Sequence, residues 1–433
     1  MSLLDSLLQP DLIDDALMPK RRSAAEHLRE RGLPGARDEA WRYTTLRSLS
    51  TKSFALSDVA AATRELPTDI ATQVQSASPR LVFVNGVMRR DWSTLDALPS
   101  GLSIDPGVPA AGLEVSPASA GRRDSEVEVA DAFDAANLAR AQDGAGISVS
   151  ADALIAEPLH LFLIHLSGEA TAVHTRIALN VAEGAAFTLV ERHIVDASCA
   201  DLDNEMLDCT IGSKARFTHV RTTASAMHLN ALHHSRYQLA ADSQVCTFEM
   251  TPGLALQRHR MDVALNGDGS RFVSGGVQAL RGRAHSDVHI SVRHQALNTS
   301  CDLIWRGIAD QRARLGFTGN LVVAVGADGS DARLSSKNLL LSQHAEINTR
   351  PVLIIHADEV KAAHGATVGR LDEQAMFYLR SRGIGRQQAR DLLTQAFAIE
   401  ALQVLDGHDV QPMMTEALAQ ALSGFVEAED HVS

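Results

Sequence analysis

The 433-residue sequence is poor in aromatic residues, has few cysteines and contains no long apolar run. Phe, Trp and Tyr together make up 4% of the residues, so a large core must be mainly aliphatic. No stretch approaches the roughly 20 apolar residues that a membrane helix needs, which argues against a membrane protein. The acidic start, MSLLDSLLQPDLIDD, lacks the basic region of a signal peptide. We therefore expect a cytoplasmic location.

The cysteines and the net charge exclude further classes. Cys199, Cys209, Cys246 and Cys301 form no CxxC pair and do not make the disulfide framework of a small secreted domain, so each is expected to be a buried, reduced thiol. The 53 acidic residues outnumber the 40 basic ones, and the net charge of −13 argues against binding to nucleic acids or anionic membranes. Of the 18 histidines, 15 lie between His160 and His364. We expect many of them to be solvent-facing positions of alternating strands.

The apolar period divides the chain into three parts. Residues 1 to about 50 show helical spacing, with a second helix expected from Ser23 to Arg31. From about residue 147 the period becomes two, as where Val288, Ile290 and Val292 alternate with polar residues. Helical spacing returns after residue 371 and predicts helices over 371–380, 387–405 and 412–427. The predicted units are a helical and mixed N-terminal domain (1–146), a β core (147–370) and a C-terminal helical domain (371–433).

Turn sequences repeat through the β core at a nearly fixed step. Similar turns are centred on residues 184, 213, 243, 270, 300 and 330, which are 29, 30, 27, 30 and 30 residues apart. An aromatic residue follows most of these turns: Phe187, Phe217, Phe248, Phe272 and Trp305. Short strands at such a step favour a β-solenoid, in which stacked coils share one core. A β-sandwich is the rival, but it would not space its turns so evenly.

Several polar groups could carry chemistry. Asp287, Asp302, Asp310 and Asp331 could supply the paired carboxylates of a carbohydrate-active solenoid enzyme, although solvated strand positions explain them as well. A basic cluster of Arg258, Arg260, Arg281 and Arg283 could contact an acidic partner or a flavin phosphate, or could form a solvated strand edge. The sequence GADGSD at 326–331 lacks the features of a phosphate loop or an EF-hand and is interpreted as a turn.

His364 is the most distinctive candidate site residue. It is expected at a strand-to-helix junction, directly before Gly365. An exposed imidazole there could ligate iron or carry a proton, because imidazole suits iron. The alternative is a structural histidine that caps the corner.

The segment 356–383 resembles the C-terminal signature of the SufB/SufD family of iron–sulfur cluster assembly proteins. The matching parts are residues 358–361 (DEVK), 364–369 (HGATVG) and 377–383 (FYLRSRG), with further matches at 335–342, 345–351 and 396–398. At the other end, residues 37–44 (RDEAWRYT) are similar to an N-terminal motif of the SufD members. Leu379 stands where SufB members place a cysteine, so the chain resembles the SufD branch.

The resemblance implies a right-handed parallel β-helix flanked by helical domains. It implies a non-catalytic scaffold that pairs with SufB through the β-helix core and binds the SufC ATPase through its C-terminal helices. The residues matched to SufC binding are Tyr378, Arg380, Leu393 and Phe397. A SufD-like homodimer working without SufB is left open.

The resemblance also bears on cofactors. No tightly bound cofactor is expected. A transient iron–sulfur cluster would form at the SufB–SufD junction, and reduced flavin could take part in the complex. Some SufD members carry a cysteine two residues before the signature histidine, but this chain has Ala362 there. His364 could therefore offer imidazole nitrogen to iron, whereas this chain offers no thiolate at that site.

Overall fold

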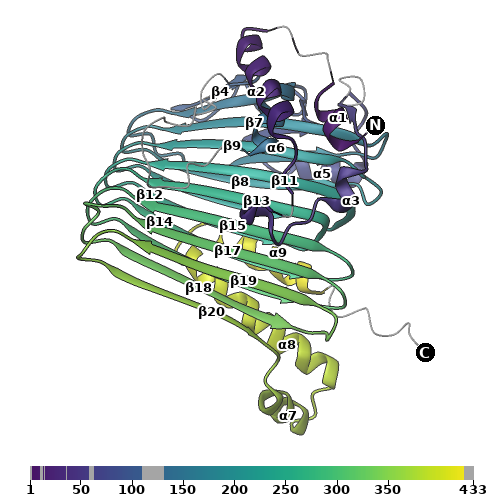
Figure 1. Cartoon of the computed structure of the whole chain (residues 1–433), viewed down its shortest axis with the longest axis vertical. Coiled ribbons are helices and arrows are strands. Elements are labelled where there is room, and N and C mark those ends of the chain that lie inside the picture. Colours follow the sequence, from purple (N-terminus) through teal and green to yellow (C-terminus); the bar gives the residue numbers. More distant parts are fainter. Residues whose placement is uncertain are drawn as a thin grey trace.

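The computed structural model describes residues 2–9, 13, 15–35, 37–57, 63–109 and 131–423. Within these ranges no helix is both long and apolar enough to cross a membrane. Most of the described chain is a long stack of parallel strands with helices against both of its flanks (Figure 1).

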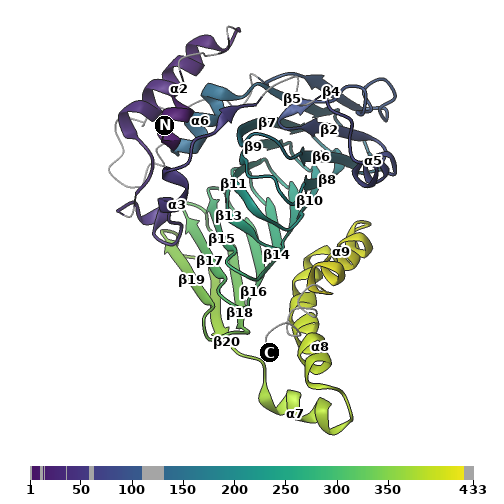
Figure 2. The same ribbon diagram turned by 90° about the vertical axis from the view of Figure 1, so that its right-hand side faces the viewer.

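The strands form two ten-stranded sheets that are the opposite walls of one solenoid (Figure 2). Consecutive strands from β5 to β20 alternate between the walls and pair in parallel with strands two places away, giving about eight coils. This connectivity confirms the predicted solenoid and excludes an antiparallel sandwich.

The first wall contains β4 (Leu102–Pro106), β5 (Asp143–Val149), β7 (Thr171–Val181), β9 (Leu202–Ile211), β11 (Ala226–Leu239), β13 (Leu254–Leu265), β15 (His285–His294), β17 (Arg314–Val323) and β19 (Glu346–Ile355), with β1 (Ala55–Leu56) paired to β7. The second wall contains β2 (Arg80–Val84), β3 (Val87–Met88), β6 (Leu159–His165), β8 (Ala186–Val195), β10 (Arg216–Thr223), β12 (Gln244–Thr251), β14 (Arg271–Leu280), β16 (Ser300–Ala309), β18 (Asp331–Leu340) and β20 (Lys361–Gly369).

The coil length follows from the strand register. Between β10 and β20 the paired residues of neighbouring coils are 27 to 31 positions apart, close to the predicted step. At the turns, residues with positive φ stack above one another, among them Gly184 (69°), Asp242 (57°) and Gly269 (70°). Their amides donate hydrogen bonds to the carbonyls of Ser213, Asp268 and Leu297 in the next coil. Left-handed backbone favours Gly, Asn and Asp, which explains the repeated turn sequences.

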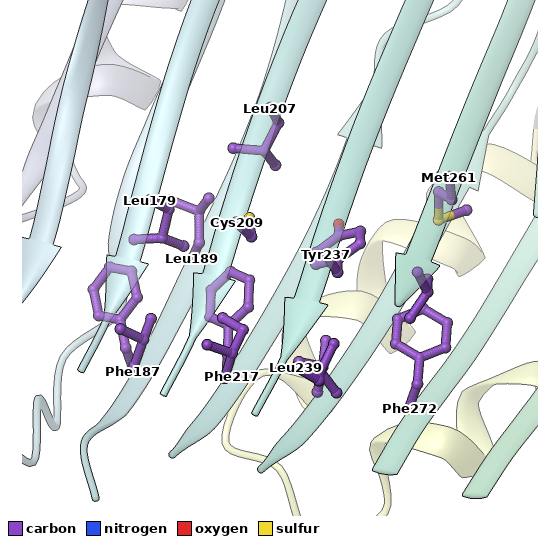
Figure 3. Close-up of a cluster of buried hydrophobic side chains, with 14 of the residues drawn as sticks. Leu179, Phe187, Leu189, Leu207, Cys209, Phe217, Tyr237, Leu239, Met261 and Phe272 are labelled. Atoms are coloured by element: carbon purple, nitrogen blue, oxygen red, sulfur yellow. The ribbon is translucent and has the colours of Figure 1, made fainter. Parts of the chain in front are cut away.

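Apolar side chains fill one half of the interior, toward these turns. Leu179, Leu207, Phe217 and Tyr237 from successive coils lie in one continuous cluster (Figure 3). The predicted aromatic series is split: Phe187, Phe217, Phe272 and Trp305 belong to this interior cluster. Phe248 faces outward instead and packs in the cluster that holds the C-terminal helices. Alternation within β12 explains the split, because Val245 takes the inward place opposite Phe217 and Phe272.

Helices cover the outer faces of both walls. The N-terminal elements are α1 (Leu3–Leu7), α2 (Met18–Arg31), η1 (Glu39–Trp41), α3 (Arg47–Ser50), α5 (Thr68–Gln75) and α6 (Ala132–Arg140). The C-terminal elements are α7 (Glu373–Ser381), α8 (Arg386–Ile399), η2 (Glu400–Leu405) and α9 (Gln411–Ser423). The helix expected from Ser23 begins at Met18, with Pro19 in its first turn. The helix predicted over 387–405 is divided between α8 and η2, and positions 424–427 of the last predicted helix lie outside the described residues.

The two ends of the solenoid differ. At the N-terminal end, β3 pairs antiparallel with β2 and β4 pairs antiparallel with β5. The apolar residues of β2 are buried and α5 packs beside them. At the other end, β19 and β20 are the last described strands of their sheets, and neither contains a buried residue. The stack therefore begins closed and ends open (Figure 1).

Candidate assembly surfaces and a buried charge cluster

His364 lies on the open end, but not where it was predicted. It occupies the middle of β20 rather than a strand-to-helix junction, because the stretch from Lys361 to Gly369 pairs with β18 throughout. Its register partner is Leu334, whose side chain belongs to the interior cluster. Paired residues of parallel strands share a face, so His364 continues an inward-facing column that no further described coil covers. The imidazole is exposed.

The open edge also presents backbone groups. The Lys361 amide donates to the Ser330 carbonyl of the preceding coil. Parallel ladders use alternate residues, so the amides of Ala362, His364, Ala366 and Val368 point away from β18. Val368 and Ile355 expose 43% and 39% of their surface, which is high for apolar residues. An uncovered parallel edge with apolar flanks is a template for pairing with another chain.

Helix α7 has no buried residue. Its Phe377 is 75% exposed and Tyr378 is 57% exposed, while Leu392 and Ile399 on α8 expose 43% and 50%. Such a concentration of exposed large apolar side chains is typical of a partner-binding surface. We call Phe377, Tyr378, Leu392 and Ile399 the helical patch.

The four residues matched to SufC binding occupy different environments. Tyr378 and Arg380 are exposed on α7. Leu393 is half-buried, and Phe397 packs against the cluster that joins the C-terminal helices to the second wall. The Arg306 guanidinium lies 5.9 Å from the Phe397 ring centroid. Sequence patterns did not single out Phe377, Leu392 or Ile399. The angle at which an amphipathic helix packs on the solenoid decides which of its apolar side chains are buried, and the sequence does not give this angle.

Residues 37–44, which carry the N-terminal motif, lie against the outer face of the first wall, and we call this segment the strap. The Arg258 guanidinium stacks 4.2 Å from the Trp41 ring centroid and donates to the Ala40 carbonyl at 2.8 Å. Arg258 also pairs with the buried Asp287 carboxylate, which accepts a hydrogen bond from Thr44. The sequence interpretation of Arg258 and Asp287 as solvated strand positions is therefore wrong, because the strap covers both. The motif has a structural role in this chain.

The interior half opposite the apolar cluster is filled with charged groups. Its buried members, which we call the interior charge cluster, are His165, Glu191, His193, Asp201, Asp203, Glu205, His219, Arg221, His233, Glu249 and His259. The expectation that many histidines face solvent is wrong for these positions, because the alternation that exposes one strand face turns the other toward the interior. The four cysteines are free and buried, as predicted.

Two carboxylates organise this cluster. Glu191 accepts from His193, from His219 at 3.0 Å and from Arg221. One oxygen of Asp203, Oδ2, faces three imidazoles: Nε2 of His233 lies 2.8 Å away, Nε2 of His165 3.3 Å and Nδ1 of His193 3.4 Å. These contacts join β6 and β8 of the second wall to β9 and β11 of the first.

Burial and the neighbouring carboxylates shift the pKa values of the groups in the interior charge cluster. Burial would lower the pKa of His165, but the Asp203 and Asp201 carboxylates outweigh it and raise that pKa to about 10. Asp203 and Glu191 act in the same way on His193, whose pKa rises to about 9. Burial and the Glu191 carboxylate raise the pKa of Glu205 to about 8. The cluster therefore holds protons at neutral pH that the same groups would release in water.

Sequence reasoning missed this cluster although a signal was present. Glu191, Arg221 and Glu249 occupy the same register position in successive coils, 30 and 28 residues apart. Charged residues that recur at the coil step inside apolar-rich strands indicate a polar column. Of the four aspartates considered for carbohydrate chemistry, Asp310 pairs with Arg390 and Asp331 with Arg333, so both carboxylates are engaged in ion pairs.

Comparison with known proteins agrees with this architecture. Residues 163–397 match the family model of the SufBD core domain of the SUF iron–sulfur cluster assembly system. The chain is 28% identical to an iron–sulfur cluster assembly SufBD family protein of Synechocystis, over 94% of this chain and 91% of that protein. It is 27% identical to the iron–sulfur cluster assembly protein SufD of Escherichia coli, over 94% and 93%. It is 25% identical to the chloroplastic protein ABCI7 of Arabidopsis thaliana, over 95% and 87%.

The matched segment contains most of the solenoid, the open end and helix α7. A solenoid of stacked parallel coils with helices on both flanks defines a class of β-solenoid proteins. This chain belongs to the SufBD family of iron–sulfur cluster assembly proteins.

Proposed function

We propose that this chain is the SufD-type, non-catalytic scaffold subunit of a SufBCD complex. Its open end pairs with SufB, its helical patch receives the SufC ATPase, and iron and sulfide are assembled as cargo at the SufB–SufD junction. The observation that carries this proposal is the open end, where β19 and β20 have no buried residue although the rest of the stack is well packed. Its cytoplasmic location and the involvement of reduced flavin stay predictions.

The main alternative is a homodimer in which two open ends pair with each other. The same free edge supports it, because an uncovered strand can pair with its own copy. A carbohydrate-active enzyme is less well supported, because Asp287 is engaged by Thr44 and Arg258 beneath the strap.

Co-expression with SufB and SufC tests the assembly. The purified material should contain all three chains in one particle by native mass spectrometry. A chain that purifies alone, or only with itself, while SufB and SufC are present would reject the SufB-paired scaffold.

His364 is the proposed contribution of this chain to the nascent cluster, as a ligand or a proton carrier. Its exposure on β20, which no further described strand covers, supports this role. His364→Ala should lower the iron and sulfide content per folded complex without lowering the melting temperature of the isolated chain. His344→Ala, which removes another exposed histidine, is the matched control. Unchanged cluster content in the His364 variant would show that the imidazole does not take part.

A further inference from the structure

Three side chains of the interior charge cluster converge closely enough to share one metal ion. His165, His193 and Asp203 are all buried, and one potential ligand atom from each lies within 4.8 Å of the other two. They come from both walls: β6 and β8 supply the imidazoles and β9 supplies the carboxylate. The strand pairing of the coils fixes the spacing between the two walls. It therefore also fixes the relative positions of the backbone at these three residues.

The distances fit coordination better than hydrogen bonding. The Asp203 Oδ2 atom lies 3.3 Å from His165 Nε2 and 3.4 Å from His193 Nδ1. Ring nitrogens that donate to a carboxylate usually lie closer, at about 2.7–2.9 Å. Two ligands bonded to one metal at about 2.0–2.1 Å in a tetrahedral arrangement are about 3.3 Å apart. The Nδ1 atom of His193 has no hydrogen-bond partner among the described residues.

The far side of each imidazole faces a carboxylate. His193 directs Nε2 to Glu191 and His165 directs Nδ1 to Asp201, at 3.5 Å. Metal-binding histidines usually donate their second N–H to a carboxylate, which fixes the tautomer and the ring orientation. His233 in turn donates from Nε2 to Asp203 at 2.8 Å and orients that carboxylate. The contact with Glu191 therefore supports His193 in the role that coordination requires, whereas His165 Nδ1 only faces the Asp201 carboxylate and makes no hydrogen bond to it.

The charge balance is compatible with a bound cation, which would replace protons that the cluster otherwise holds. The interior charge cluster contains five carboxylates, Glu191, Asp201, Asp203, Glu205 and Glu249, but only one arginine, Arg221. With neutral imidazoles the carboxylates exceed the guanidinium by four. Buried negative charge is costly unless it is paired, so the cluster must take up protons or a metal ion.

We propose that His165, His193 and Asp203 bind one divalent first-row transition-metal ion inside the solenoid. Two imidazoles and one carboxylate suit Fe²⁺ and Zn²⁺, which share this ligand chemistry. Cys199 lies outside the set, because burial raises the pKa of its thiol and so disfavours the thiolate. The site is separate from His364 on the open end and does not depend on the proposed partners. It also differs from the expectation that no tightly bound cofactor is present.

The first experiment measures metal in the full chain. The protein is refolded without oxygen in the presence of Co²⁺, Zn²⁺ or Fe²⁺, each alone, and passed through a chelating resin. We expect about one metal ion per chain by elemental analysis and a raised melting temperature, since an ion that binds only the folded state stabilises it. The Co²⁺ form should show visible ligand-field bands without a thiolate charge-transfer band. Wild-type protein that folds but retains none of the three metals would overturn the proposal.

Comparison of the Zn²⁺ and Fe²⁺ forms then identifies the preferred ion, by competition at equal concentrations. His165→Asn, His193→Asn and Asp203→Asn should each reduce metal content about tenfold or more. His294→Asn, which alters a buried histidine outside the cluster, should retain it. Cys199→Ser should also retain it. Variants of all three ligands that fold and keep the wild-type metal content would place the ion elsewhere and reject the site.

Discussion

The two ends of this solenoid are made from the same coil but are finished differently. At the N-terminal end, the antiparallel strands β3 and β4 end the sheets, and the apolar side chains of β2 are buried beneath α5. At the C-terminal end, β19 and β20 repeat the register of earlier coils, yet their inward-facing columns stop at the surface. The difference teaches that the chain completes its own core at one end and leaves the core uncovered at the other.

The comparison predicts the largest effect for charge introduced at the closed end. Phe162 is fully buried beside α5, and Phe162→Asp should destabilise the chain by about 4 kcal/mol or more, because an unpaired carboxylate would be buried. Val368→Asp on β20 should change the free energy of unfolding by no more than about 0.5 kcal/mol. Urea unfolding of the isolated variants measures both. Similar destabilisation by the two substitutions would contradict the difference between the ends.

The pH dependence of stability provides a second test, nearer the open end. His294 is buried against Thr299 and Cys301, and burial lowers the pKa of this imidazole to about 4. Asp331 is the charged group that opposes this shift. In the unfolded chain the pKa is about 6.5, so the unfolded state binds the proton first as the pH falls. The contribution of neutral His294 to the free energy of unfolding is therefore complete above pH 6.5 and decreases as the pH falls toward 4. The total loss is about 3 kcal/mol.

His294→Asn should remove this dependence. Unfolding free energies of wild type and variant at pH 7, 6 and 5 should converge as the pH falls. A difference between the two proteins that stays constant across this range would show that His294 does not control the acid sensitivity.

The smallest effect on the chain itself is expected at the helical patch. Replacing Phe377 and Leu392 together by Ser should change the free energy of unfolding by no more than about 0.5 kcal/mol, because both side chains are largely exposed. The same variant should bind SufC at least about tenfold more weakly, since large apolar anchors dominate interfaces. Gln374→Ala on the same helix is the control. Titration calorimetry measures the affinity, and unaltered binding would place SufC elsewhere.

Phe397 shows why the helical patch could not be read from the sequence. Its position in an amphipathic helix is equally compatible with docking a partner and with packing on the solenoid. In the structure it is half-buried and packs against the cluster that joins the C-terminal helices to the second wall. The coil step and the helical flanks, by contrast, were predictable, because the left-handed turn residues recur with the coil. The pairing of His165 and His193 with Asp203 was not, since it depends on which strand face turns inward and on how the two walls oppose each other. His364 was found from its motif, but its place within β20 required the register with β18.

Amide hydrogen exchange of β20 tests most directly the claim that the open end is completed by a partner. In the free chain, at a concentration where mass analysis shows a monomer, the outward amides of Ala362, His364, Ala366 and Val368 should exchange rapidly. In the complex with SufB they should slow by at least about tenfold, whereas the buried strand β2 should be unchanged, because only the open edge gains new hydrogen bonds. Equal exchange of β20 in the free chain and in the complex would contradict the account.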